Sequence, residues 1–582
     1  MGKWWSKLLG RDQREAIKGP VPRLRNIVVN NFRGILGVIV PIAVLSWQPK
    51  KDVHNITVQC MWMWMFWFFL IQPIAVPCTA MIPIFILPMC GVMSTMDTAK
   101  CYFNEGVALF MLASMLVLLW NNSGFDRRIA LCFLTSGDAC QFSGKRLVFK
   151  CSMAAYILSM FSNRLIVSST LTQYITPIFL NLQSSYGKSG AEPNFDEMRC
   201  IINNAIQTSS SIGSIAILHS AYATLVFKAV WCDASPEAGK EYPDVFNYLQ
   251  YSAYAFPVSV VMFMFNVCYH MLLVNIFVRK PMSAGTMNEV RTNIMKLKDS
   301  VPKRVTLHEK LTVFFSLFSL LILFVRWNKY QDPGWAQYNL QAGAEKVPFV
   351  KDACVAAIFV VALHILPKSF NFWQFVSVDK KSELKDLKPE SAILWWRFVD
   401  KNINYGYFFI CGAAIAINKS ARDSGLGKIL AENFGKDFTS PSWCVGLFLV
   451  CLITCILANF MTGCAALVCI LPFVINMSVS PAPVPWQGKL YLAALGVGVG
   501  SSLGFMLPFL YTPAYFCHYT GKVPVLKMIK YSFLSVWGCC AILWFSLCYW
   551  APYLWDPNDN GILPVAAPAS GSTTTTTEAV AP

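Results

Sequence analysis

Long stretches without charged residues set the hydrophobic pattern of this chain. No Lys, Arg, Asp or Glu lies between Asp52 and Asp97, and Lys489 is the only such residue between Asp437 and Lys522. Stretches of this kind are typical of membrane-spanning helices, each of which needs about 20 predominantly apolar residues. The pattern therefore predicts an all-α polytopic membrane protein.

The apolar segments predict about eleven transmembrane helices and several shorter re-entrant pieces. The spans are expected near residues 32–48, 60–90, 104–120, 147–161, 165–184, 203–228, 248–277, 311–327, 352–366, 442–458 and 528–550, the second being open to a break at its prolines. The re-entrant pieces are expected around 392–418, 460–478 and 490–516. Hydropathy alone counts helices poorly when they break inside the bilayer.

Two four-residue sequences recur about half the chain apart. Ser210-Ser211-Ile212-Gly213 and Ser501-Ser502-Leu503-Gly504 each lead through a short apolar run into a polar turn. Interrupted helices at matching places in two halves are typical of secondary transporters, in which the ends of half-helices hold a solute and ions near mid-bilayer. Small residues also recur by chance in membrane helices, so the match gains weight only from its surroundings. Transport is the leading hypothesis.

Composition and charge narrow the class. The chain is 55% hydrophobic and only 14% charged, with a mean hydropathy of +0.47, whereas soluble domains are about 25% charged. The net charge of +17 is dispersed over short loops, which indicates orientation in a cell membrane and argues against nucleic-acid binding. We expect the basic segments in the cytosol and the acidic or neutral ones outside, so the N-terminus is predicted to be cytosolic and the C-terminus extracellular. The basic segments are 1–31, 121–150, 279–310 and 367–401, and the others are 232–247 and 551–582.

The sequence offers no enzymatic motif. It contains no nucleotide-binding P-loop, no Gly-rich dinucleotide loop and no His-Glu-x-x-His zinc motif. Its 21 cysteines show no metal-binding spacing, although Cys200 and Cys232 flank a predicted span and leave a disulfide open. Asn55-Ile56-Thr57, in the first predicted outer loop, makes Asn55 a candidate glycosylation site. We expect no enzyme, and no cofactor except sodium ions.

A series of partial motifs runs through most of residues 32–550. In order, they are Arg128-Ile129-Ala130-Leu131, Leu158-Ser159-Met160, Ser211-Ile212-Gly213 through Leu225-Val226, Ala416 through Asp423-Ser424-Gly425-Leu426, and Phe505-Met506-Leu507-Pro508 followed by Thr512-Pro513 and Gly521. Together they resemble the divalent anion/sodium symporter (DASS) family.

The resemblance implies an inverted-repeat, elevator-type transporter with two re-entrant hairpins. It implies a homodimer in the lipid bilayer that moves a small anionic solute, such as citrate, succinate, a related carboxylate or sulfate, with sodium. The expected domains are a cytosolic N-terminal segment (1–31), scaffold helices (32–155 and 311–390), transport-domain segments that each contain a hairpin (156–278 and 391–550), a cytosolic amphipathic linker (279–310) and an extracellular low-complexity tail (551–582).

The resemblance also places solute and sodium sites at the hairpin tips and broken turns. The first Ser-Asn-Thr motif of the family corresponds to Ser162-Asn163-Arg164, or after an alignment shift to Ser168-Ser169-Thr170, and the second to Thr462-Gly463-Cys464. The implied solute-binding residues are Ser162, Asn163, Arg164, His219, Ser220, Thr224, Thr462, Gly463, Thr512 and Pro513. The implied sodium ligands, in degenerate form, are Ser162, Asn163 and Thr462.

Several side chains that hold ions in the family are missing here. Gly463 replaces an asparagine and Asn459 replaces an acidic residue, so side-chain oxygens are lost while backbone carbonyls remain. Sodium coupling is therefore expected to be weak or absent. The N-termini of the half-helices could still bind a dianion, because their partial positive charge does not depend on side chains.

Arg164 and His219 carry the chemical hypotheses. Arg164 is the only charged residue between Lys150 and Lys188. Its guanidinium could replace sodium as a fixed counter-charge for a carboxylate or sulfate, or it could extend from a helix end into lipid headgroups. An unperturbed histidine side chain has a pKa of about 6.5. His219 could therefore couple a proton to transport, or it could be a structural residue that donates a hydrogen bond to a backbone carbonyl.

Two functions remain open on these grounds. The first is a secondary carrier of di- or tricarboxylates, or of sulfate, with reduced sodium dependence. The alternative is a transport-inactive paralogue that keeps the fold and acts as a regulatory or structural membrane partner, because fold and activity separate readily.

Overall fold

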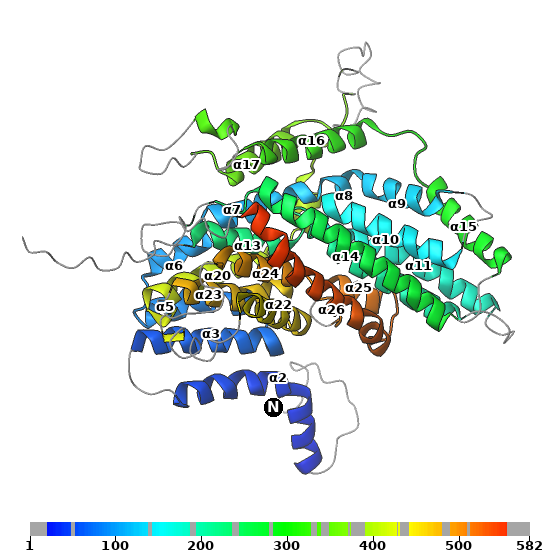
Figure 1. Ribbon diagram of the computed structural model, residues 1–582. Helices are drawn as coiled ribbons and strands as arrows, with labels where there is room; N and C mark the ends of the chain where they lie inside the picture. Colours follow the sequence, from blue (N-terminus) through cyan, green and yellow to red (C-terminus); the bar gives the residue numbers. More distant parts are fainter. Residues whose placement is uncertain are drawn as a thin grey trace, which may run out of the picture.

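The protein is all-helical in the computed structural model (Figure 1). The structure describes residues 20–47, 53–137, 143–186, 194–234, 242, 244–278, 283–326, 334–338, 349–370, 373, 390–427, 429–430, 442–479, 489–508 and 512–555. No strand occurs within these ranges apart from an isolated bridge between Pro367 and Ala392. The predicted fold class, an all-α membrane protein, is confirmed. Most of the N-terminal segment 1–31 and of the tail 551–582 lies outside the described residues.

The first helix starts earlier than its apolar run. Helix α2 (Pro20–Trp47) begins at a proline, a residue favoured there because the first N–H of a helix has no intrahelical partner. Non-helical backbone at Asn31 (φ −121°, ψ 15°) divides α2 into two segments. Figure 1 shows the resulting sharp bend.

The apolar stretch predicted over residues 60–90 is broken at its prolines, as the sequence indicated. Helix α3 (Val53–Ile71) ends just before Pro73, and two short helices follow, α4 (Val76–Ala80) and α5 (Ile82–Met89). Both short helices carry a proline in the first turn, which stops the preceding helix from continuing. Asn55 lies half-buried in the first turn of α3, and its glycosylation stays a prediction.

The first hairpin and the first broken helix follow one another. Helices α10 (Gly144–Phe161) and α11 (Arg164–Tyr186) are joined by Ser162 and Asn163 alone. Helix α12 (Phe195–Gly213) then ends, and residues 214–221 form turns before α13 (Tyr222–Asp233) begins. Ser168-Ser169-Thr170 lies inside α11, so the hairpin tip is at Ser162-Asn163.

The second half of the chain repeats this order. Helices α22 (Trp443–Phe460) and α23 (Gly463–Val479) are joined by Met461 and Thr462. Helix α24 (Leu490–Gly500) then ends, and α25 (Thr512–Tyr519) begins further on. Both serine-marked sequences therefore end a helix, as predicted, and the break after Gly213 divides the single span expected over residues 203–228 into α12 and α13.

The two matching glycines explain why the serine-marked sequences recur. A Cβ atom on Gly213 would lie 2.2 Å from the carbonyl oxygen of Tyr156 in α10, and one on Gly504 would lie 2.0 Å from the carbonyl oxygen of Ala458 in α22. Each broken helix thus presses against the first arm of its own hairpin at a point where no side chain fits. The same contact occurs in both halves.

The remaining helices connect and surround these two units. Residues predicted to form an amphipathic linker at 279–310 form α15, whose Val290 and Ile294 are buried. The piece expected to be re-entrant around 392–418 contains the short helix α19 and most of the helix α20, with residues 403–405 between them, and its re-entrant course stays a prediction. The bounds of the other helices are α6 (Thr95–Tyr102), α7 (Glu105–Val117), α8 (Leu119–Ser123), α9 (Phe125–Thr135), α14 (Tyr248–Phe277), α15 (Ala284–Asp299), α16 (Leu307–Phe324), η2 (Trp335–Tyr338), α17 (Asp352–Ile365), α19 (Trp396–Asn402), α20 (Gly406–Asp423), α26 (Val525–Tyr549) and α27 (Ala551–Leu554).

Six helical segments in the described part of the chain are long and apolar enough to cross a membrane. They are Thr95–Ser123, Arg164–Tyr186, Tyr248–Phe277, Leu307–Phe324, Trp443–Phe460 and Val525–Tyr549. Four shorter apolar helices join them, at Val76–Met89, Asp352–Ile365, Gly463–Ser478 and Leu490–Gly500. Two of the six, Arg164–Tyr186 and Trp443–Phe460, are hairpin arms, so these segments do not give the number of spans and the count of about eleven stays a prediction.

A buried ion cluster joins α13 to the helices after the linker. Lys228 in α13 pairs with Asp244, and its Nζ lies 3.8 Å from Asp352 Oδ2. Arg326 pairs with Asp352 through Nε, and its Nη2 lies 2.8 Å from Asp244 Oδ2. The side chains of Lys228, Arg326 and Asp352 are at most 2% exposed, whereas that of Asp244 is 34% exposed. Burial would raise the pKa of Asp244, but the charges of Lys228 and Arg326 outweigh it and hold that pKa below its ordinary value.

Candidate functional site

The first hairpin tip is held against the start of α13. The backbone N–H of Asn163 donates to Asn121 Oδ1 at 3.2 Å, and its side-chain amide donates to the Tyr222 hydroxyl at 3.2 Å. Asn163 Oδ1 accepts from the N–H of Leu165 at 2.9 Å, which caps α11. The N-termini of α11 and α13 therefore meet at this tip.

Arg164 is buried beside the tip rather than extended into headgroups. Its side chain is 8% exposed, and its Nη1 donates to Ser214 Oγ at 3.1 Å, one residue beyond the close contact of Gly213. Helix α13, which begins at Tyr222, packs against α23 of the second hairpin. Arg164 thus lies where the first hairpin meets the first broken helix, and α13 connects this tip to the second hairpin.

The polar side chains of the first broken turn are used to hold the turn itself. Ser220 Oγ donates to the carbonyl of Met160 near the hairpin tip, and Thr224 Oγ1 lies 2.6 Å from the carbonyl of Leu218 and 2.8 Å from that of Ala221. The ring of His219 packs against that of Tyr248, with centroids 5.9 Å apart. These contacts give Ser220 and Thr224 a structural task in addition to any contact with solute.

The second hairpin tip is fixed to the second broken helix. A Cβ on Gly463 would lie 2.1 Å from the carbonyl oxygen of Ser501, so the missing side chain permits a close approach. Asn459 Oδ1 accepts from the N–H of Met506 at 2.8 Å. Thr462 Oγ1 accepts from the N–H of Ala465 at 3.2 Å and so caps α23.

These contacts decide what the predicted site residues can do for an ion. Ser162 Oγ is buried and makes no hydrogen bond within the described residues, so it is available as a ligand. Thr462 already caps a helix, and Arg164 adds a positive charge beside the first tip. No cluster of His, Cys, Asp or Glu suited to a metal occurs in the described residues. Sodium at this site would rest on Ser162, Asn163 and backbone carbonyls.

The last predicted residues lie at the start of α25. Thr512 is its first residue, although the Thr512 side chain lies outside the described residues, and Pro513 is buried in its first turn. His518, further along α25, lies with Nδ1 2.7 Å from the carbonyl of Val523. This part of the site is thereby tied to the loop that leads into α26.

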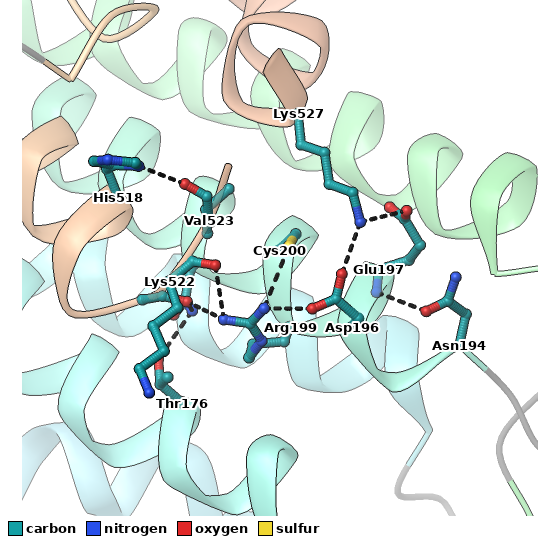
Figure 2. Close-up of polar contacts among 12 residues, drawn as sticks. Thr176, Asn194, Asp196, Glu197, Arg199, Cys200, His518, Lys522, Val523 and Lys527 are labelled. Atoms are coloured by element: carbon teal, nitrogen blue, oxygen red, sulfur yellow. Dashed lines mark hydrogen bonds and ion pairs between the residues drawn. The ribbon is translucent and has the colours of Figure 1, made fainter. Parts of the chain in front are cut away.

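Figure 2 shows how that loop is attached to the beginning of α12. Arg199 Nη1 donates to the carbonyls of Gly521 and Lys522, and its Nη2 pairs with Asp196. Lys527 of α26 lies 2.7 Å from Asp196 and 2.7 Å from Glu197. The second broken helix is therefore anchored to the first at the end opposite the hairpin tips. Cys200 beside this cluster and Cys232 are both free, so no disulfide joins them.

Sequence reasoning missed Asn121, Ser214 and Tyr222, and it treated Asn459 only as the loss of an acidic group. All four hold a tip or a broken turn through contacts distant in sequence. Only Tyr222 and Ser214 had a signal, because they border the predicted break after Gly213.

Two hairpins and two broken helices that repeat in the two halves, with helix N-termini meeting at a buried arginine, are the architecture of a secondary membrane transporter. Such proteins move solutes and do not act as enzymes.

The family follows from the sequence. Residues 32–555 match the family model described as "Sodium:sulfate symporter transmembrane region". The chain belongs to this family of divalent anion/sodium symporters, as the partial motifs indicated.

Similar proteins extend over nearly the whole chain. "Protein I'm not dead yet" of Drosophila melanogaster is 22% identical over 519 residues, which cover 84% of this chain and 83% of that protein. "Sodium-dependent high-affinity dicarboxylate transporter 2" of Caenorhabditis elegans is 22% identical over 571 residues, covering 92% and 96%. "Solute carrier family 13 member 2" of Homo sapiens is 23% identical over 567 residues, covering 88% and 90%.

Solved structures resemble the chain less closely. MtrF of Neisseria gonorrhoeae, described within a class of antimetabolite efflux pumps, has a TM-score of 0.48 at 12% identity and covers 78% of this chain and 83% of its own. The YdaH transporter of Alcanivorax borkumensis has a TM-score of 0.43 at 13% identity and covers 78% and 87%. The family assignment therefore depends on the sequence.

Proposed function

We propose that this protein carries a di- or tricarboxylate, such as succinate or citrate, or sulfate, across the membrane with weakened or absent sodium coupling. The observation that carries the proposal is the meeting of helix N-termini at Arg164. The family and the names of the relatives, which include sodium-dependent dicarboxylate transporters, support the solute class.

The helix ends supply a favourable place for a dianion. Helix α11 begins at Arg164, α13 begins at Tyr222, and α23 begins at Gly463. Asn163 joins the first two of these N-termini, and α13 packs against α23, the helix to which the third belongs. Helix N-termini carry unsatisfied N–H groups and partial positive charge, which bind carboxylates and sulfate through the backbone.

Arg164 supplies the charge that sodium provides in a coupled carrier. A guanidinium makes two parallel hydrogen bonds with a carboxylate or sulfate, and it cannot dissociate from the protein. At the second tip, Gly463 has no side chain and Thr462 caps a helix. The fixed charge at the first tip reduces the need for sodium, and the lost ligands at the second tip weaken the binding of sodium.

The experiment is counterflow of labelled succinate, citrate and sulfate in proteoliposomes, with sodium or with choline as the cation. We expect uptake of at least one anion. Replacing choline by sodium should change the affinity for that anion by less than about five-fold, which is the lower end of the coupling that two linked sites typically show. Arg164→Thr should weaken the affinity for the anion about 10- to 100-fold, because a charge-assisted hydrogen bond contributes about 1.5–3 kcal/mol.

Arg164→Lys and Arg422→Thr are the matched controls. The first keeps the charge and should retain part of the affinity, and the second removes an arginine that pairs with its neighbour Asp423 outside the site. If Arg164→Thr transports with unchanged affinity, the role of Arg164 is refuted. If the folded protein moves none of the three anions, the alternative of a transport-inactive membrane partner replaces this proposal.

The assembly is part of the same proposal. We propose a homodimer with a cytosolic N-terminus and an extracellular C-terminus, in which segments 156–278 and 391–550 move against the scaffold helices as an elevator. The positive residues of the N-terminal segment and of α15 support this orientation. Protease access to tags at the two ends in sealed vesicles tests it.

A further inference from the structure

Helices α11 and α12 run antiparallel and are joined at two points by polar contacts. At one end, Arg164 donates to Ser214 at 3.1 Å, and at the other, Asn203 Nδ2 donates to Thr176 Oγ1 at 3.0 Å. The two contacts lie about three helical turns apart on both helices. They fix the register between the two helices.

The register places further polar residues opposite one another between these contacts. Moving one turn at a time along α11 from Arg164 leads to Ser168, Thr172 and Thr176, because residues four apart share a helix face. The same steps along α12 put Ser211 opposite Ser168 and Gln207 opposite Thr172. We call these eight residues the α11–α12 seam: Arg164, Ser168, Thr172, Thr176, Asn203, Gln207, Ser211 and Ser214.

Four oxygen atoms of the seam make no hydrogen bond within the described residues, although all four are fully buried. They are Ser168 Oγ, Thr172 Oγ1, Asn203 Oδ1 and Gln207 Oε1. Buried polar atoms nearly always have a partner in the protein or in ordered water. Four such atoms in one seam therefore point to a missing partner that is not protein.

The orientation of the two amides is fixed by their other contacts. Gln207 Nε2 donates to Asn204 Oδ1 at 2.7 Å and to the carbonyl of Phe505 at 3.0 Å, and both of these groups only accept. Asn203 Nδ2 faces the carbonyl of Gly521 in the same way at 3.4 Å. A flipped amide would lose these bonds, so both amide oxygens must remain the unsatisfied atoms.

The spacing of the four oxygens decides between an ion and water. Successive positions along the seam are about 6 Å apart, so Ser168 and Asn203 lie about 12 Å apart along the helices. A metal ion binds oxygen at about 2.0–2.6 Å and cannot join ligands separated by more than about 5 Å. Arg164 at one end and Arg199 at the other also disfavour a cation.

We propose that the α11–α12 seam holds a file of ordered water molecules that leads from the loop at Gly521 to Arg164 at the first hairpin tip. Water donates to the amide oxygens of Asn203 and Gln207 and both donates to and accepts from the hydroxyls of Ser168 and Thr172. The file gives the buried guanidinium a hydrated route to the beginning of α12, which Figure 2 shows beside Thr176 and Arg199. This inference is independent of the transported solute.

The test is the sign of a stability change. Thr172→Val keeps the shape of the side chain and removes its hydroxyl. If water occupies the seam, the variant loses hydrogen bonds and its melting temperature falls, by about 1–2 °C for a chain of this size. If the seam is dry, the substitution removes an unsatisfied buried group, and the melting temperature stays the same or rises.

Ser168→Ala is the second variant, with the same expected sign. Thr208→Val is the matched control, because Thr208 Oγ1 is already bonded to the carbonyl of Asn204 at 2.9 Å and to Asn266 at 3.0 Å, and its loss lowers stability in either case. An experimental density map that resolves water elsewhere in the protein must show water between Thr172 and Gln207, and its absence overturns the proposal. So does an unchanged or raised melting temperature in both seam variants. A stabilisation by sodium that Thr172→Val abolishes would identify the occupant as a cation and would also overturn it.

Discussion

Removing Arg326 from the buried ion cluster should destabilise the protein strongly. In the native cluster, two positive and two negative groups balance, with Arg326 between Asp244 and Asp352. Arg326→Met leaves one net negative charge among groups of which Asp352 is 2% exposed. Loss of one partner from a buried pair costs about 3–5 kcal/mol, and a contact of unit charges near 4 Å gives about 4 kcal/mol. Because Asp244 is 34% exposed and partly screened, we expect about 3 kcal/mol.

The assay is thermal and denaturant unfolding in detergent, where about 3 kcal/mol corresponds to a fall of about 3 °C. The double variant Arg326→Met with Asp352→Leu should recover at least half of the loss, because it leaves the neutral pair of Lys228 and Asp244 in apolar surroundings. Arg422→Gln, which breaks the more exposed pair with Asp423, should cost under about 1 kcal/mol. A cost below about 1 kcal/mol for Arg326→Met, or no recovery in the double variant, would refute the view that an unbalanced buried charge dominates.

Further predictions concern the contacts between helices. Gly213→Ala and Gly504→Ala should each lower the unfolding free energy by about 1–3 kcal/mol, because the new Cβ would overlap a carbonyl oxygen. Gly34→Ala is the control: its Cβ would have no heavy atom within 4 Å, so the melting temperature should stay the same or rise. The pKa of Asp244 is held below its unfolded value of about 3.9, so the contribution of this carboxylate to the free energy of unfolding should be constant from about pH 5 to 8 and be lost progressively below about pH 4. A pH series of denaturant unfolding on Asp244→Asn should lack this loss. Asn459→Leu should cost about 1–3 kcal/mol by leaving the N–H of Met506 without its acceptor. Asn459→Asp should also lower the melting temperature, because a buried carboxylate would face the carbonyl of Cys455, to which the Asn459 amide donates.

The broken helices were predictable because their sequences carry the physical reason for the break. The serine-marked sequences combine small residues with polar ones in an uncharged region, and small residues are what close approach requires. The contact that uses Gly213 involves the carbonyl of Tyr156, in another helix. The position of each break could therefore be read locally, but its partner could not.

The helices within residues 392–418 could be predicted only in part. The sequence predicts a short re-entrant piece there, and the structure has α19 and α20, the second of which is continuous through Gly412 and Asn418. Gly412 faces the ring of Tyr102, where a Cβ would lie 2.1 Å from a ring carbon, and the polar Asn418 receives a hydrogen bond from Asn476 at 3.0 Å. Residues that look like breaks are satisfied by tertiary contacts with α6 and α23, which local sequence does not reveal.

The candidate site, too, could be predicted from the sequence only in part. The resemblance left the first tip open between Ser162-Asn163-Arg164 and Ser168-Ser169-Thr170, and the structure selects the former and places Arg164 next to Ser214. The resemblance could not show that Ser220 binds the carbonyl of Met160 in α10 or that Thr224 binds the carbonyls of Leu218 and Ala221. Which polar side chains remain available for a solute depends on packing, and not on motif membership.

The repeated contact between a glycine and a carbonyl has a mechanical consequence. Gly213 ties the first broken helix to the first hairpin, and Gly504 does the same in the second half. Each half of the site is thus a single stiff body, since a contact without intervening side chains leaves no room for sliding. In the elevator movement proposed above, each of these bodies would travel as one piece, and a crosslink between a hairpin tip and the broken helix of the same half should leave transport unchanged.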